Sequence, residues 1–312
     1  MSRNYGLGQR DMERAGCIAL KKGIATGEFS FSTVATYCGQ WGLFCKWAAL
    51  RNIKKMENIT YELVEEYGRE LANRVTTDCL SAATAQNYLS AVNTVMRIAT
   101  GGSWKSLSPT KNCGIKQRSA IRASAPGALD IAIYDLGLIF VRTQVGARAG
   151  SVVGLARMLG MRSKEASLFD AKRGLAEAKR FGFITISAGT KGGRKRKVPI
   201  TSAVQLECLQ SSAVAQGDSR AIMPPDKKWQ TWREQELRRA RELMKTHTDG
   251  GLHDLRSAYA CQRYQELTGH AAPCAGGSIQ DRAVDLAARL IVSAELGHGR
   301  EEVVAEYIGG KK

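Results

Sequence analysis

The sequence predicts a mainly α-helical chain with a small β-hairpin, an α+β protein built from two domains. Three observations support this fold class. At 312 residues the chain is long enough to bury two separate cores. Apolar residues recur at helical spacing through most of the chain, and its first third shows no strand pattern. One strong strand pattern, residues 183–187, is followed by a glycine-rich turn and a second short strand.

The N-terminal region is predicted to be a small helical domain over residues 26–110. A polar and basic stretch, residues 1–25, precedes it, and we expect an arm or a short leading helix there. Ser32 is the predicted N-cap of the first helix, and Trp41 and Trp47 are expected in the core, because a small domain needs its aromatic residues for packing. The predicted helices span residues 31–50, 61–75 and 83–99.

A basic linker is predicted over residues 111–127, where glycine and proline punctuate the chain. Two interpretations stay open for it. It is either a solvated loop or, if the two domains hold a duplex between them, the segment that crosses the DNA phosphates. The basic residues in and just before it are Lys105, Lys111, Lys116, Arg118 and Arg122.

The C-terminal domain, residues 128–312, is predicted to be mostly helical with the β-hairpin inserted. Its strands are residues 183–187 and 196–200, joined by a turn at 189–193. Its predicted helices cover residues 130–144, 152–159, 229–245, 255–267, 283–292 and 301–307.

The formal net charge of +17 indicates a polyanionic partner, and nucleic acid is the first candidate. A membrane surface is the second. No basic amphipathic helix stands at either end, however, and no apolar run approaches the ~20 residues of a membrane span. The N-terminus also lacks the apolar stretch of a secretory signal, so we expect a cytoplasmic protein. On charge alone, a basic protein with no polyanion partner is the alternative.

The eight cysteines are scattered without a Cys-x-x-Cys pair, as in proteins whose thiols stay reduced. Cys261, His270 and Cys274 are close in sequence and invite comparison with metal ligands. Their spacing matches no common zinc pattern, and a fourth ligand is missing. We therefore predict no metal site and no cofactor.

Six residues of the second half carry the candidate chemistry of phosphodiester cleavage. Guanidinium groups suit the charge that gathers on the non-bridging oxygens, because they stay charged and offer a fork of donors. A tyrosine can attack the phosphorus and a lysine can protonate the leaving oxygen, so a covalent phosphotyrosine needs no metal and no nucleotide. The six residues are Arg162, Lys191, His253, Arg256, His298 and Tyr307.

In this order and spacing the chain resembles the tyrosine recombinase family, which includes phage-type and Xer-like integrases. The most specific feature is Tyr307, which follows His298 by nine residues. The resemblance covers residues 125–312 strongly and 26–110 more loosely, and residues 4–12 are similar to integrases of mobile conjugative elements. It implies a core-binding domain and a catalytic domain that close as a C-shaped clamp on a duplex. The matching stretches are residues 160–165, 189–195, 252–256, 296–298 and Tyr307.

The resemblance implies that Arg162 and Arg256 bind the phosphate. His253 would accept a proton or donate to the phosphate, and His298 would donate to a non-bridging oxygen. The structural alternatives are a surface arginine paired with Glu165 and buried, hydrogen-bonded histidines. Ser163 is a possible N-cap of a helix that would fix Arg162 at its start.

Tyr307 would be the nucleophile and Lys191 the general acid, with Lys195 as its rival. A packing tyrosine on the last helix is the alternative for Tyr307. The turn that carries Lys191 is rich in basic residues, most of which are expected to grip DNA phosphates. These DNA-binding candidates are Arg194, Lys195, Arg196 and Lys197, joined by Thr84, Asn87 and the basic residues of 229–245 as candidates for base contacts.

The function that the resemblance implies is site-specific recombination at double-stranded attachment sites by a homotetramer on two DNA sites. Integration and excision of a phage or mobile element is the first expectation, with accessory directionality or host DNA-bending proteins as possible partners. Resolution of chromosome or plasmid dimers, a type IB topoisomerase and a catalytically silent DNA-binding relative are the alternatives.

Two departures from the family pattern concern how protomers meet. Residues 270–282 resemble an insertion, and five residues follow Tyr307, where family members commonly send a segment to a neighbouring subunit. We expect residues 1–25 or the insertion to supply that contact instead.

Overall fold

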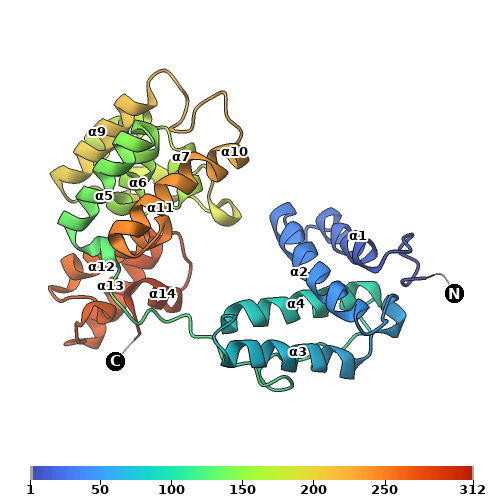
Figure 1. Ribbon diagram of the computed structural model, residues 1–312. Coiled ribbons are helices and arrows are strands. Elements are labelled where there is room, and N and C mark those ends of the chain that lie inside the picture. The colour runs from blue at the N-terminus through green and yellow to red at the C-terminus, as the bar shows by residue number, and fades with distance from the viewer. Residues whose placement is uncertain (1–2, 311–312) are drawn as a thin grey trace. The chain divides into compact units, whose positions relative to one another are not determined.

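The computed structural model describes residues 3–310, so the first two residues of the predicted arm and the last two after Tyr307 lie outside the described part. The chain divides into two compact units, residues 1–119 and 120–312, which are labelled by element in Figure 1. The described residues form helices and a two-stranded sheet, which confirms the predicted mainly helical fold class.

Unit 1 contains the three predicted helices, each begun by a hydroxyl side chain that caps its first turn. The cap of the first is Ser30 rather than the predicted Ser32, since the Ser30 hydroxyl accepts from the Thr33 N–H. The three are α2 (Phe31–Ala49), α3 (Tyr61–Thr76) and α4 (Ala82–Ala99). Unit 1 also contains α1 (Met12–Ala25) and a short 3₁₀ turn, η1 (Met56–Asn58).

Of the two expectations for residues 1–25, an arm or a short leading helix, the structure has the helix: residues 12–25 form α1, which packs against α2 and α4. Ala15, Ala19 and Leu20 of α1 are fully buried. The Trp41 indole donates to the Met12 carbonyl at 3.2 Å, and Trp41 and Trp47 are buried in the core as predicted. α1 is therefore part of the unit 1 core.

The first part of the predicted linker also belongs to unit 1. Cys113 and Ile115 are buried in the unit 1 core, and Gly68 of α3 leaves the space that the Cys113 side chain fills. Only the residues of the predicted linker that follow Ile115 lead to unit 2.

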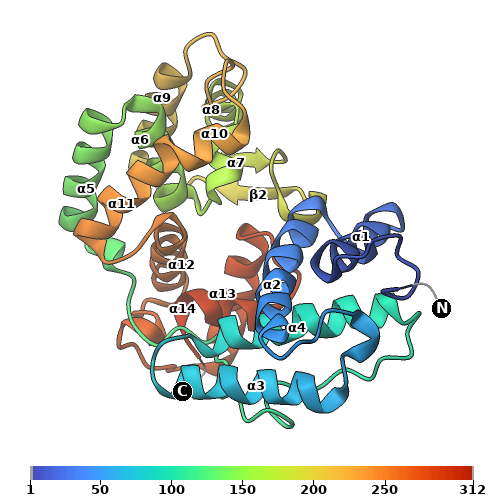
Figure 2. The ribbon, with the colours of Figure 1, turned by 45° about the vertical axis from the view of Figure 1, so that its right-hand side comes forward.

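Unit 2 is a helical assembly around α6, whose residues are almost all buried. Figure 2 shows α12, α13 and α14 together on one side of this unit, where α13 and α14 both pack against α12. The helices are α5 (Ile131–Gln144), α6 (Ala147–Leu159), α7 (Ser163–Leu168), α8 (Ala171–Phe181), α9 (Ala203–Gln216), α10 (Trp229–Glu234), α11 (Glu236–Thr248), α12 (Leu252–Thr268), α13 (Arg282–Glu295) and α14 (Ala305–Ile308). Short 3₁₀ turns are η2 (Gly127–Leu129), η3 (Lys191–Gly193), η4 (Pro273–Ala275) and η5 (Glu301–Val304).

The predicted hairpin is present as β1 (Phe183–Ile186) and β2 (Arg196–Pro199), paired antiparallel with Ile186 opposite Arg196. The connecting turn lies against α7. Gly189 has φ 71°, and a Cβ there would sit 2.9 Å from the Lys164 carbonyl oxygen, so this close approach requires glycine. The hairpin thereby presents the basic turn next to the start of α7.

One helical prediction needs correction, and two helices were missed. The helix predicted over 229–245 is broken at Gln235 (φ −101°, ψ −85°), which lets Trp232 of α10 donate to the Ser167 hydroxyl while α11 packs on α5. α8 and α9 were not predicted. The buried face of α8 consists of Ala171, Gly174 and Ala178, so it lacks the large apolar residues by which an amphipathic helix is recognised.

Within residues 3–310, the helices are all too short or too polar to cross a bilayer.

Candidate active site

The first arginine of the motif stands between two helices of unit 2. α6 ends at Gly160, which adopts a left-handed conformation (φ 59°) and leaves no room for a Cβ against the Tyr259 ring. Arg162, not the predicted Ser163, is the N-cap of α7. Its backbone N–H donates to Glu165 Oε2 at 2.7 Å, and its Nη1 donates to Glu165 Oε1 at 2.8 Å. Arg162 is thus fixed at a helix start, and the pairing with Glu165 is also present.

The second arginine, Arg256, ties two helix ends together from inside. Three positions separate it from His253, so both project from one face of α12 near its start. Arg256 is fully buried and donates to the carbonyl oxygens of Gly160 and Leu296, the residues that follow α6 and α13. Burial lowers the pKa of Arg256 to about 10, which leaves it charged at neutral pH.

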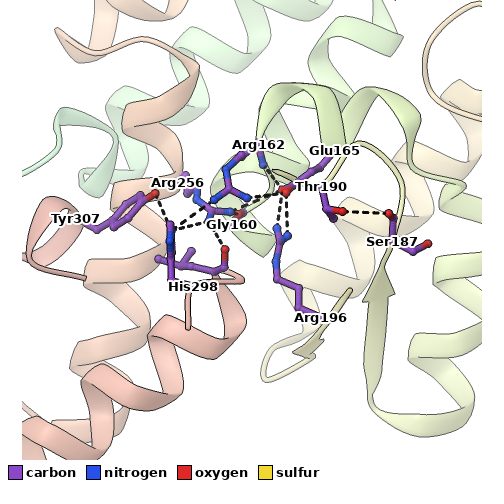
Figure 3. Close-up of polar contacts among 10 residues, drawn as sticks. Gly160, Arg162, Glu165, Ser187, Thr190, Arg196, Arg256, His298 and Tyr307 are labelled. Atoms are coloured by element: carbon purple, nitrogen blue, oxygen red, sulfur yellow. Dashed lines mark hydrogen bonds and ion pairs between the residues drawn. The ribbon is translucent and has the colours of Figure 1, made fainter. Parts of the chain in front are cut away.

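His298 lies at the centre of the cluster (Figure 3). Its backbone N–H donates to the Ser293 carbonyl at 2.8 Å, and Gly297 before it takes φ 72°, so the chain turns sharply after α13. The His298 Nε2 atom lies 3.5 Å from Arg162 Nη2, 3.4 Å from Arg256 Nη2 and 3.1 Å from the Tyr307 hydroxyl. One imidazole nitrogen therefore meets both guanidinium groups and the phenol.

Tyr307 comes from α14 and is buried among these residues. Its ring centroid is 5.6 Å from that of His298 and 5.5 Å from that of His253, and the Arg256 guanidinium carbon lies 5.5 Å from it. Burial, followed by the charges of Arg256 and Arg162, lowers the pKa of His253. At neutral pH His253 is accordingly a neutral imidazole next to the phenol.

His298 should stay neutral through the physiological range. Burial and then the charges of Arg256 and Arg162 lower its pKa to about 4. Because this folded-state value lies below the usual 6.5, His298 contributes stability that is present above pH 6.5 and is lost as the pH falls toward 4. In an NMR titration of the histidine ring signals, we expect no His298 transition between pH 5 and 8.

Arg162→Gln provides the matched control, because it removes one neighbouring charge and should raise the His298 pKa. A His298 titration near pH 6.5 in the folded wild-type protein would contradict the arrangement.

Glu165 is the acidic counterpart of this cationic cluster, and sequence reasoning treated it only as a possible surface partner. It is fully buried and binds Arg196 through two hydrogen bonds of 2.9 and 2.6 Å, in addition to Arg162. Arg256 Nη1 lies 3.7 Å from its Oε2. Burial opposes its ionisation, but the hydrogen bonds and charge of Arg196 and then Arg162 outweigh this and lower the pKa of Glu165 to about 2.

The basic turn of the hairpin divides into exposed and buried members. Lys191, Arg194, Lys195 and Lys197 are exposed. Arg196 departs from the expected phosphate contact, because its side chain is 3% exposed and both of its terminal nitrogens bind Glu165. The alternation follows from the strand, since Arg196 faces inward on β2 where its neighbours face solvent.

Thr84 and Asn87 of α4 lie in unit 1, whereas the cluster belongs to unit 2. Thr84 is half-buried and its hydroxyl meets that of Ser81 at 2.8 Å in the first turn of α4. Asn87 is exposed and accepts from Arg118 at 3.3 Å. Of the two, Asn87 has the freer side chain.

The predicted insertion folds back onto the tyrosine helix. Cys274 of η4 lies with its sulfur 3.5 Å from that of Cys261 on α12, and both thiols lie within 3.7 Å of the Tyr307 carbonyl. Within the described residues, His, Cys, Asp and Glu side chains form no cluster of three or more that could hold a metal ion. The two thiols pack behind Tyr307.

Comparison with known proteins finds a family model and solved structures that are similar to this chain. Residues 119–262, which include Arg162, Lys191, His253 and Arg256, match the family model described as Integrase. No curated protein sequence matches the chain significantly.

Solved structures of similar fold have low sequence identity to the chain. A phage lambda integrase dimer bound to a COC′ core site has a TM-score of 0.60 at 15% identity, over 94% of this chain and 76% of that chain. XerH recombinase bound to a palindromic difH substrate has a TM-score of 0.59 at 19% identity, over 93% and 78%. The Tn1549 transposon integrase in complex with circular intermediate DNA has a TM-score of 0.57 at 12% identity, over 95% and 96%. These matches show that the chain shares the fold of these integrases and recombinases, and that its residues 119–262 resemble the Integrase family.

Proposed function

We propose that the chain is a site-specific DNA recombinase that cleaves and rejoins DNA through a 3′-phosphotyrosine intermediate, in the integration and excision of a phage or mobile element. The observation that carries the proposal is the position of the Tyr307 hydroxyl, 3.1 Å from His298 Nε2 in a cluster that holds Arg162 and Arg256. A packing tyrosine would not need two arginines and two neutral histidines around it.

In the proposed cleavage step the Tyr307 oxygen attacks the phosphorus and the bond to the 5′ oxygen breaks. The phenol proton passes to His253, whose lowered pKa leaves it able to accept one at neutral pH. Arg162 and Arg256 stabilise the charge that gathers on the non-bridging oxygens, a contribution that is typically about 3–4 kcal/mol for each donor. The bond energy is kept in the phosphotyrosine, so religation by a 5′ hydroxyl needs no cofactor.

Lys191 is the proposed general acid that protonates the departing 5′ oxygen. It is exposed on the hairpin turn, and its charge helps to lower the pKa of His298, so it lies close enough to the cluster to act there. This proximity favours Lys191 for the role. Lys195, with Arg194 and Lys197, is left to hold DNA phosphates.

The proposed partner is double-stranded DNA bearing attachment sites, bound by four protomers on two sites. The net charge of +17 and the exposed cations of the hairpin supply attraction to phosphates without sequence preference. Lambda integrase has been solved as a tetramer bound to a Holliday junction, and the same assembly is proposed for this chain. Accessory directionality or DNA-bending proteins would set the outcome of exchange.

The test is covalent capture on nicked suicide duplexes built from the DNA that flanks the gene. After cleavage beside the nick, a short strand diffuses away and leaves protein on the DNA, which a denaturing gel resolves. We expect an adduct at one discrete position, lost completely in Tyr307→Phe, because phenylalanine keeps the ring packing and removes only the attacking oxygen.

The outcomes separate the alternatives. Adducts scattered over any DNA would favour a type IB topoisomerase, and a site at a chromosome or plasmid dimer locus would favour resolution. Tight binding without an adduct, or an adduct that survives in Tyr307→Phe, would reject the proposed chemistry.

A further inference from the structure

The segment that opens unit 2 is bound to the helix that carries Tyr307. The backbone N–H of Arg122 donates to the carbonyl oxygen of Ala305 at 2.9 Å. Ala305 is the first residue of α14, two positions before Tyr307. The start of unit 2 therefore meets the tyrosine helix through the main chain, across more than half of the sequence.

The side chain of the same residue holds a second element of the site. Arg122 Nη2 lies 2.5 Å from Asp254 Oδ1, and Nε donates to the Ser124 carbonyl at 2.7 Å. The Arg122 and Asp254 side chains are 20% and 13% exposed, so their pairing is largely shielded from water. Asp254 follows His253 in the first turn of α12. Arg122 thus connects the residue beside His253 with the helix of Tyr307.

α14 is an element that needs such support. It has four residues, follows a 3₁₀ turn and has no side-chain cap at its N-terminus. Helices of this length are not stable by themselves and depend on tertiary contacts. The Ala305 carbonyl also accepts from the Gly309 N–H within the helix at 3.2 Å, so the Arg122 N–H adds a bond from outside at the same oxygen.

The guanidinium of Arg122 is not arranged as a phosphate contact. Among the basic residues of the linker region it is committed to a carboxylate and a carbonyl on its own unit. A phosphate contact would instead leave its donors directed to solvent. The Arg122 side chain therefore holds parts of unit 2 together.

We propose that Arg122 is a positioning residue for strand cleavage, which keeps the start of α12 and the start of α14 in register so that His253 and Tyr307 stay together. This inference rests on the proposed function and adds to it a residue outside the family motif. A shift of about 1 Å in a reacting group can slow a reaction up to about a hundredfold.

The test compares Arg122→Ala, Arg122→Lys and Asp254→Asn in the full-length protein on the nicked duplex. Single-turnover adduct formation is measured at saturating protein, and DNA affinity is measured separately. We expect Arg122→Ala to slow adduct formation about tenfold or more with DNA affinity unchanged within about twofold. Arg122→Lys should recover most of the rate, because an ammonium can still pair with Asp254. The double variant Arg122→Ala/Asp254→Asn should lose no more than the worse single variant.

Arg148→Ala is the matched control for general loosening of unit 2. Arg148 also braces a loop, through the carbonyls of Gln216 and Ile222 at 2.9 Å each, but lies outside the cluster. It should lower the thermal midpoint without slowing adduct formation.

Three results would overturn the proposal: wild-type cleavage by Arg122→Ala, an equal loss in Arg148→Ala, or no recovery by Arg122→Lys. Weaker DNA binding with a reduced salt dependence in Arg122→Ala would also overturn it, since that is the signature of a phosphate contact. Absence of any adduct with the wild-type protein would instead count against the proposed function itself.

Discussion

Replacing Arg256 with lysine should both slow strand cleavage and weaken the fold, whereas the same change at Arg162 should affect cleavage alone. Arg256 is fully buried and spans the carbonyls of Gly160 and Leu296 while its Nη2 faces His298. An ammonium is a point charge without the planar fork, so lysine cannot satisfy both carbonyls and serve the phosphate as well. The Arg162 side chain is 23% exposed and makes no such connection between helix ends.

Loss of one preorganised donor should slow cleavage about 10²- to 10³-fold in either variant. For Arg256→Lys we also expect a loss of a few kcal/mol in unfolding free energy, because buried carbonyl groups lose their partners. Adduct formation on the suicide duplex and urea denaturation measure the two effects separately. Equal stability of Arg256→Lys and Arg162→Lys would show that the Arg256 bonds to the helix ends contribute little, and wild-type cleavage by either would remove that arginine from the proposed mechanism.

The residues that lie together in unit 2 could be predicted because chemistry fixes their types and their order along the chain. Each of them occupies a defined position in a short sequence motif, and the fold brings them into contact with one another. They are Arg162, His253, Arg256, His298 and Tyr307. The hairpin could be predicted as well, because the alternation of apolar residues on either side of a glycine-rich turn is visible in a short stretch of sequence.

The buried ionic partners could not be predicted because their signal is not local. Arg196 belongs to a run of basic residues, a pattern that predicts exposure to solvent. Its partner Glu165 lies 31 residues earlier in the chain. Arg122 and Asp254 are separated by 132 residues. Helix α1 was difficult to predict for another reason. Its buried face is largely alanine and glycine, which pack closely without forming a conspicuous apolar stripe in the sequence.

Glu165 is the position where a change in charge should cost the most stability. Its carboxylate is fully buried, accepts from Arg196 and Arg162, and lies 3.7 Å from Arg256. Glu165→Gln keeps the shape but leaves these guanidinium groups without their anion. Removing one partner from a buried ion pair typically costs about 3–5 kcal/mol, and we expect a loss of that order in urea denaturation at pH 7.

The pH dependence of the same measurement distinguishes the charge from the packing. The folded-state pKa of Glu165 is about 2, below the ordinary 4.5, so its contribution is fully present above pH 4.5 and is lost as the pH falls toward 2. The difference in unfolding free energy between wild type and Glu165→Gln should therefore shrink across that window, and a constant difference would contradict a charge effect. Arg196→Met is the matched partner: the double variant should lose less than the two single losses combined, because the cation that Glu165→Gln strands is then gone. Simple additivity would mean that Arg196 does not act through Glu165. The positions of Arg162 and Arg256 would then depend on the bonds of Arg256 to the ends of α6 and α13 alone.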